Sequence, residues 1–396
     1  MTSQKEFEPR RRQSQLPKEK QRQQGQGVYQ RFAKPVLFAF SPDFVHNATM
    51  NFLAGVGGVP FAPKAIESFF VTPHPELESS WQGINFTSPV GLSAGLDKNA
   101  QAVKIMQSVG FGFSEVGSVT ARRCDGNPRP WFYRLPNTQS LVVHAGLPNK
   151  GIDVIMRRLE RLPQKWQQDF PTIISLARTN DKAASSDEAG IADFMVSFVR
   201  AMSSPAVQII EINISCPNAF VGERFTDPKL LKRLLAKLAK LEKTKPVLIK
   251  MPIELSWEET DALIQIAAES GMVDGFTFGN LRKDRTDVKF KDELPESVEG
   301  SLSGAPTRQL STQLIAKTYK KYGNKFLIIG VGGILSAKDA YEKIRAGATY
   351  VELITGLILN GPAFVEEVNT GLVKLLKRDG YGHISDAIGV DADKLS

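Results

Sequence analysis

A cluster of chemically useful side chains lies at the end of an apolar segment, in residues 213–218 (NISCPN). Residues 209–212 are mostly isoleucine, which is typical of a buried strand, and the proline of the motif ends that strand. Asn213 and Asn218 each offer a hydrogen-bond donor and acceptor, and the Cys216 thiol becomes reactive when it ionises. A loop held on a rigid strand often carries a site. The alternative is an ordinary turn with a buried thiol.

Two later segments suggest a phosphate site. Residues 330–333 (GVGG) and Ile354-Thr355-Gly356 each follow an apolar strand. Glycines let backbone N–H groups approach an anion closely, so these turns predict a phosphate of a substrate or of flavin mononucleotide (FMN). Lys250 ends another apolar strand, where it is either a functional cation or a surface residue with its head in water. His144 has no second ligand nearby, so no metal site is predicted.

Short apolar strands alternate with helices through most of the chain, which predicts a parallel sheet. The predicted strands are 89–94, 112–118, 172–177, 209–213, 246–250, 275–278, 326–330 and 350–354. Eight such strands favour a (β/α)8 TIM barrel of the α/β class. An open doubly wound sheet is the alternative, although no G-x-G-x-x-G opens the first unit. The two longest connections, 120–151 and 281–306, are predicted as inserts without strands.

The bulk composition bounds the remaining possibilities. The chain has 396 residues, 42% of them hydrophobic, which is enough for one large core. Its net charge of +8 is concentrated partly in the first 27 residues, and no nucleic-acid-binding motif accompanies it. Two cysteines provide no disulfide framework and indicate a reducing compartment. No segment has the length and hydrophobicity of a transmembrane helix, so we expect a cytoplasmic protein or one on the inner face of a membrane.

The chain is predicted to have four parts: a disordered basic tail at 1–27, an apolar helical extension at 28–60, the barrel at 61–380, and a C-terminal tail at 381–396. Gly55, Gly57 and Gly58 are expected to end the helical extension. The extension packs on its own domain, or it contacts a membrane or a lipophilic substrate. The oligomeric state is left open.

Several motifs in order resemble the dihydroorotate dehydrogenases, FMN enzymes of pyrimidine biosynthesis, over about residues 81–377. The matching segments are 94–98 (AGLDK), 115–120 (EVGSVT), 126–128 (GNP), 213–218 (NISCPN), Lys250, 302–304 (LSG), 329–333 (IGVGG) and 361–362 (GP).

The resemblance implies an oxidoreductase that converts dihydroorotate to orotate at a CH–CH bond. Cys216 stands where the family has its general base, and Lys250 would stabilise the reduced flavin. The implied FMN-binding residues are Ala94, Gly95, Ser118, Ser175, Asn213, Lys250, Gly279, Gly304, Gly332, Gly333, Thr355 and Gly356. The implied substrate-binding residues are Lys98, Gly146, Leu147, Asn149, Asn213, Asn218 and Asn280. The apolar extension resembles that of the membrane-bound class, which implies a quinone acceptor, whereas Cys216 resembles the soluble class.

Four positions depart from the family pattern. Val143 replaces an Asn that contacts substrate in the family, and Ser175 replaces an Asn that contacts the flavin. Gly279 replaces a Thr, and Leu281 replaces a polar residue. His144 or Asn149 would compensate, or the substrate is another cyclic amide or enone. A phosphate-binding barrel without catalysis is the third interpretation.

Overall fold

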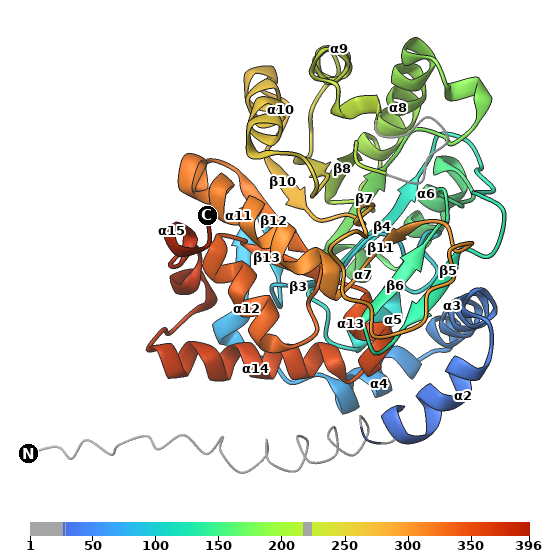
Figure 1. Ribbon diagram of the computed structural model, residues 1–396, viewed down its shortest axis with the longest axis vertical. Coiled ribbons are helices and arrows are strands. Elements are labelled where there is room, and N and C mark those ends of the chain that lie inside the picture. The colour runs from blue at the N-terminus through green and yellow to red at the C-terminus, as the bar shows by residue number, and fades with distance from the viewer. Residues whose placement is uncertain (1–26, 28, 217–223) are drawn as a thin grey trace, which may run out of the picture.

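The computed structural model describes residues 27, 29–216 and 224–396 (Figure 1). Eight parallel strands close a barrel in the order β10-β12-β13-β3-β4-β7-β8-β9. The TIM barrel is therefore confirmed, and each predicted strand overlaps one barrel strand. Their bounds are β3 (Val90–Leu92), β4 (Phe113–Val119), β7 (Thr172–Leu176), β8 (Ile209–Asn213), β9 (Val247–Met251), β10 (Gly275–Phe278), β12 (Leu327–Val331) and β13 (Tyr350–Leu353).

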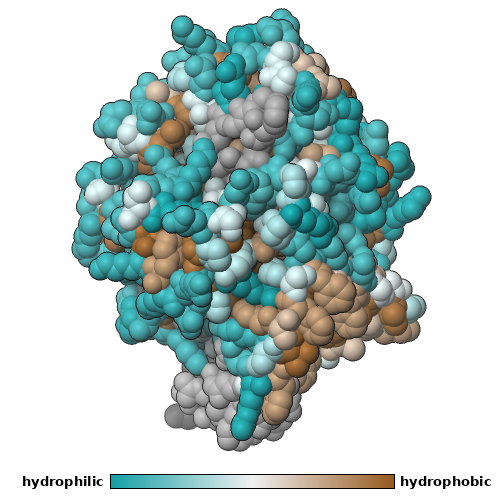
Figure 2. Space-filling view, turned by 45° about the vertical axis from the view of Figure 1, so that its right-hand side comes forward, coloured by the Kyte–Doolittle hydropathy of each residue, from teal (hydrophilic) through white to brown (hydrophobic). Residues whose placement is uncertain are grey.

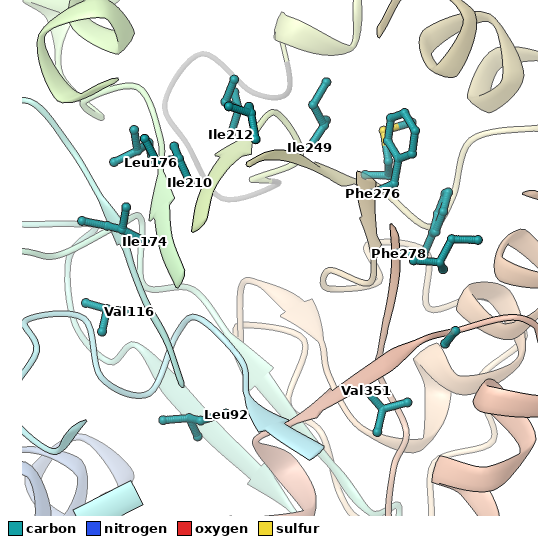
Figure 3. Close-up of a cluster of buried hydrophobic side chains, with 14 of the residues drawn as sticks. Leu92, Val116, Ile174, Leu176, Ile210, Ile212, Ile249, Phe276, Phe278 and Val351 are labelled. Carbon is teal, nitrogen blue, oxygen red and sulfur yellow. The ribbon is translucent and has the colours of Figure 1, made fainter. Parts of the chain in front are cut away.

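Helices surround the barrel because alternate residues of each strand point outward and are apolar. Figure 3 shows these side chains, including Ile174, Ile210 and Phe276, pointing away from the barrel centre. The helices packed around the barrel are α5 (Val103–Ser108), α6 (Ile152–Glu160), α7 (Gln164–Asp169), α8 (Asp187–Met202), α9 (Pro228–Leu238), α10 (Trp257–Ser270), α11 (Arg308–Tyr322), α12 (Ala337–Ala346), α13 (Thr355–Asn360) and α14 (Phe364–Asp379).

The inward residues form layers of contrasting chemistry. The bottom layer is an apolar cluster of Phe113, Ile173, Ile209, Leu248, Leu327, Ile329 and Tyr350, covered by Phe86 of the hairpin β1 (Ser79–Trp81)–β2 (Ile84–Phe86). Two residues further along five of these strands, the same face carries Glu115, Ser175, Glu211, Lys250 and Glu352, and Thr277 of β10 lies opposite Lys250; all six are buried. We call these six residues the polar layer. Such layers are usually filled by branched apolar side chains, so this one indicates a function at the barrel mouth.

The two long inserts form a small sheet of their own, so the expectation of strand-free inserts was wrong. β5 (Phe132–Leu135) and β6 (Ser140–Val143) make a hairpin, and β11 (Ser301–Leu302) pairs with β6 in the order β11-β6-β5. The pairing joins segments far apart in sequence, Ser301 opposite Val143. Turn-rich composition concealed these short strands, whose stability comes from partners that local patterns do not reveal.

The N-terminal helices extend further than predicted. After a π-helical turn, η1 (Tyr29–Ala33), come α2 (Lys34–Ala39), α3 (Pro42–Gly58) and α4 (Ala62–Phe70). α3 ends at Gly58, the last of the three glycines expected to end it, and Gly55 and Gly57 lie inside its final turn. Gly57 packs against Lys104 and Ile105 of α5, and Lys104 Nζ donates to the Gly57 carbonyl at 3.3 Å. This close packing outweighs the helix cost of about 1 kcal/mol per glycine.

The C-terminal segment predicted as a tail is ordered against the barrel. A 3₁₀ turn, η7 (Ile384–Ala387), and α15 (Ala392–Leu395) follow α14, and α15 packs on α11 (Figure 1). Ile384 and Ala387 are buried, and Arg345 of α12 pairs with both Asp379 and Asp391. These buried and paired groups hold the segment in place, although its composition resembles that of a loop.

Candidate active site

A cavity of about 480 Å³ opens at the carboxyl ends of the barrel strands, between the barrel and the N-terminal helices. Its volume lies within the range of about 300–1,000 Å³ of typical ligand sites. The predicted site residues that line it are Ala94, Gly95, Lys98, Ser118, Gly146, Leu147, Asn213, Cys216, Lys250, Gly279, Asn280, Gly304, Gly332, Gly333, Thr355 and Gly356. The barrel thus brings together residues that are scattered over the chain.

Three predicted residues lie elsewhere. Asn218 falls outside the described residues. Ser175 is fully buried behind Ser118, with 3.0 Å between their hydroxyl oxygens, and does not line the cavity. Asn149 does not line it either. Its amide donates to Thr120 Oγ1 and to the Leu147 carbonyl, and its Oδ1 accepts from the N–H of Gly151 at 2.8 Å. These bonds give Asn149 a structural position under the Gly146–Leu147 turn.

Lys250 reaches the cavity from the polar layer. Its Nζ lies 2.8 Å from Glu115 Oε2 and 3.5 Å from Glu211 Oε1. Burial alone would lower the pKa of Lys250, but Glu115, Glu211 and Glu352 outweigh it and raise that pKa above its ordinary value. Burial raises the pKa of Glu115, yet the Lys250 ammonium overcomes this effect and lowers it to about 2. Lys250 therefore stays charged in the floor of the cavity.

Glu115 also positions the loop that follows β3. Its Oε2 accepts a hydrogen bond of 2.8 Å from the Ala94 N–H, in addition to that from Lys250. Lys98, at the end of the same loop, donates to the Gly95 carbonyl, and its ammonium lies 5.2 Å from the Phe132 ring centroid. Burial lowers the pKa of Lys98 to about 8. The Glu115 carboxylate thus links the loop after β3 to Lys250 of β9.

Ser215 joins the two asparagines of the cavity wall, a role that the sequence interpretation missed. Asn280 Nδ2 donates to both the carbonyl and Oγ of Ser215, at 2.7 Å each. Asn213 Oδ1 accepts from the Ser215 N–H at 3.0 Å and from its hydroxyl at 3.2 Å. Ser215 is fully buried. Its place between two singled-out residues of one motif could have suggested this role.

A hydrogen-bonded chain runs from this wall into the polar layer. Asn213 Nδ2 donates to Ser118 Oγ at 2.8 Å, Ser118 contacts Ser175, and Ser175 Oγ donates to Glu211 Oε1 at 2.8 Å. Glu211 in turn lies beside Lys250. Each of these hydrogen bonds restrains the two side chains that it joins, so the residues fix one another's orientation. Ser175 therefore supports the cavity wall from behind.

The glycine turns after β12 and β13 both line the cavity. Gly332 and Gly333 have φ values of 101° and 70°, which favour glycine. A Cβ on Gly333 would lie 2.3 Å from Arg308 Cβ. Thr355 Oγ1 lies 2.9 Å from Ser303 Oγ, beside Gly304. These glycines line the cavity without side chains, so their backbone N–H groups are accessible to an anion.

The Cys216 thiol lines the cavity and is half-buried. The Arg178 side chain, buried behind β7, attracts its ionised form. Burial and Arg224 lower the pKa of Arg178, while Asp187, Asp193 and Cys216 oppose them. Because this attraction is mutual, the guanidinium favours the thiolate.

One end of the cavity is apolar. The N-terminal helices contribute Leu37, Phe38, Val45, Met50, Phe52 and Leu53, and α13 contributes Leu357 and Ile358. Tyr29 Oη donates to the Ile358 carbonyl at 2.7 Å, which ties the extension to α13. His46 also lines this end, and burial, with Lys98 and Arg129, lowers its pKa to about 3, so it is neutral at pH 7. The composition of the extension predicted this apolar surface.

Three departures from the family pattern lie on the cavity wall. Val143, Gly279 and Leu281 all line it. His144, the residue expected to compensate, does not line the cavity. Its Nε2 lies 3.3 Å from Asn127 Nδ2 and 3.3 Å from Glu299 Oε2.

In the described residues no group of His, Cys, Asp and Glu is arranged to hold a metal ion, and no helix could cross a membrane.

Known proteins resemble the chain over most of its length. The family model described as dihydroorotate dehydrogenase matches residues 76–376. A dihydroorotate dehydrogenase (quinone) of Anaeromyxobacter dehalogenans is 34% identical over 90% of this chain and 96% of its own. The dihydroorotate dehydrogenase (quinone) of Gloeobacter violaceus is also 34% identical, over 91% of this chain and 98% of its own length.

A solved structure agrees with these sequence matches. The DHODH of Eimeria tenella in complex with ferulenol matches with a TM-score of 0.76 and 27% identity, over 88% of this chain and 95% of that one. Together with the residues gathered around the cavity, these matches show that the chain belongs to the dihydroorotate dehydrogenase family.

Proposed function

We propose that this protein oxidises dihydroorotate to orotate, with FMN as the bound cofactor and a quinone as the final electron acceptor. The observation that carries the proposal is the convergence of Lys250, Asn213, Asn280, Cys216 and the glycine turns on one cavity. The relatives named as quinone-dependent dihydroorotate dehydrogenases support the same substrate and acceptor.

The residues present suit a flavin. The glycine turns after β12 and β13, with Thr355, would hold its phosphate, and the loop from Ala94 to Lys98 would lie along its ring. Lys250 would face the pyrimidine edge of the ring, because a buried ammonium stabilises negative charge that develops there. FMN, when bound, supplies the hydride acceptor.

The chain's own residues would then carry out the proton chemistry. Asn213 and Asn280, held by Ser215, would orient a planar ring that bears N–H and C=O groups. The Cys216 thiolate would take a proton from the carbon beside the substrate carbonyl, while hydride leaves the adjacent carbon. An ordinary thiol, with a pKa of about 8.5, is a thiolate only to a minor extent at pH 7. The positive charge of Arg178 would increase the thiolate fraction of Cys216.

The apolar end of the cavity would admit the quinone. The N-terminal helices also expose large apolar side chains, namely Phe32, Val36, Phe40, Phe44, Phe52, Val59, Phe61 and Phe69. Figure 2 shows apolar side chains gathered on the lower part of the molecule, where Figure 1 places α2 and α3. Such a patch suits a peripheral contact with a membrane that contains the quinone.

A second candidate follows from Val143 and Leu281 on the cavity wall. A missing amide would cost about 1–3 kcal/mol of substrate recognition if the substrate presented a polar atom to it. A related cyclic amide or enone with an apolar edge would fit this wall without that loss.

The test is anaerobic mixing of the purified holoprotein with dihydroorotate in a stopped-flow spectrometer. The flavin absorbance is expected to bleach, and a short-chain quinone added afterwards is expected to restore it. A flavin that stays oxidised with dihydroorotate but bleaches with another cyclic amide would favour the second candidate. Bleaching without recovery in quinone would refute the proposed acceptor.

A further inference from the structure

Glu352 is a buried acid on β13 that faces the cavity. It belongs to the polar layer, has no exposed surface, and lines the cavity beside Lys250. Neither of its carboxylate oxygens has a hydrogen-bond donor in the described part of the chain. Burying such a group costs several kcal/mol unless a ligand or a proton satisfies it.

Within the polar layer, Glu352 can be hydrogen-bonded to the Glu115 side chain, another carboxylate, only through a shared proton. Lys250 is the ammonium of this layer, and it pairs with Glu115 at 2.8 Å and with Glu211 at 3.5 Å. The groups facing Glu352 are thus Glu115 of β4, Glu211 of β8 and Lys250 of β9. Burial first, and then the repulsion by Glu115 and Glu211, raise the pKa of Glu352 well above its ordinary value against the attraction of Lys250.

We propose that Glu352, carrying a proton, contacts the pyrimidine edge of the flavin and tunes how readily the ring accepts electrons. This inference rests on the proposed flavin function. A carboxylic acid offers one donor and an acceptor, which matches an edge of alternating C=O and N–H groups, whereas a carboxylate only accepts. Reduction of the flavin places negative charge on this edge. A neutral acid beside the edge therefore favours reduction, and an ionised acid opposes reduction.

Glu211 provides a matched comparison. It lies in the same layer, is equally buried, and its pKa is also raised, by burial and by Glu115. It does not line the cavity, and its Oε1 contacts Ser175 and Lys250 while its Oε2 is buried without a hydrogen-bond partner in the described residues. A general electrostatic role of the layer would make the two acids equivalent, whereas direct contact with the flavin singles out Glu352.

The test is the midpoint potential of the flavin in the holoprotein, measured by redox titration for wild type, E352L, E352Q and E211Q. At pH 7 we expect E352L to shift the reduction equilibrium at least tenfold toward the oxidised flavin, which corresponds to about 30 mV for two electrons. E352Q keeps a donor and an acceptor, so it should remain within threefold of wild type. E211Q changes the charge environment of Lys250 but leaves the proposed contact intact, so its shift should be smaller than that of E352L.

A pH series supplies the second comparison. As Glu352 ionises at alkaline pH, the potentials of wild type and E211Q should fall further than that of E352Q. Flavin content, measured on each preparation, identifies variants that fail to fold. A wild-type potential in E352L, or an equal shift in E211Q, would overturn the inference while leaving the proposed function intact. A wild-type protein that binds no flavin would instead refute the proposed function.

Discussion

Replacing Ser215 with alanine should impair catalysis without removing the flavin. The hydroxyl accepts from Asn280 Nδ2 at 2.7 Å and donates to Asn213 Oδ1 at 3.2 Å, so two of the bonds that hold the cavity asparagines are lost. At about 0.5–1.5 kcal/mol per hydrogen bond, the cost is about 1–3 kcal/mol. Because about 1.4 kcal/mol is tenfold in rate, kcat/KM for dihydroorotate should fall about 5- to 150-fold.

The assay is steady-state orotate formation with a short-chain quinone, alongside the flavin content and the melting temperature. Ser197→Ala is the matched control, because Ser197 is equally buried but lies on α8, where its hydroxyl donates to the Asp193 carbonyl at 3.4 Å. The control should keep wild-type kcat/KM. If Ser215→Ala also kept kcat/KM within twofold of wild type, the role of Ser215 in holding the two asparagines would be refuted.

Three further predictions concern the base, its neighbour and the apolar patch. Cys216→Ala should retain flavin and slow anaerobic flavin reduction by about 10²–10⁴-fold, the usual contribution of a general base; near-normal reduction would remove that role. Arg178→Gln should raise the pKa of the thiol and move the acidic limb of the kcat/KM profile to higher pH; an unmoved limb would exclude this coupling. Phe44→Glu with Phe61→Glu, at side chains 59% and 84% exposed, should weaken binding to anionic phospholipid vesicles and spare flavin bleaching. Val390→Glu is the matched control for vesicle binding, and equal binding by all forms would contradict a membrane contact.

Much of the barrel could be predicted because its strands are buried on both faces. Segments such as 209–213 and 247–251 are mostly apolar and buried throughout. This pattern can be recognised in the sequence without knowing which strands pair. The strands β5, β6 and β11 were missed because each is short and because the pairing of β6 with β11 joins two separate inserts. The helix α4 and the C-terminal turns η7 and α15 were not predicted, because their stability comes from packing on the barrel.

The cavity residues were predicted best where a motif placed them at strand ends. The polar layer was missed, although its pattern was visible: Glu115, Glu211 and Glu352 are each a lone acid within an apolar strand. That they meet depends on barrel closure and on the register of the strands, which pairs Glu211 with Leu248 and Glu352 with Gly91. The supporting positions of Ser175 and Asn149 likewise depend on hydrogen bonds that sequence alone does not specify.

The most direct test of the central claim is a single turnover without oxygen or quinone. Holoprotein of known flavin concentration is mixed with excess dihydroorotate, and orotate is quantified by chromatography after quenching. We expect one orotate for each flavin reduced, because the cavity orients the substrate ring for removal of one proton and one hydride. An oxidised flavin and no orotate, in a protein that retains its cofactor, would contradict the account.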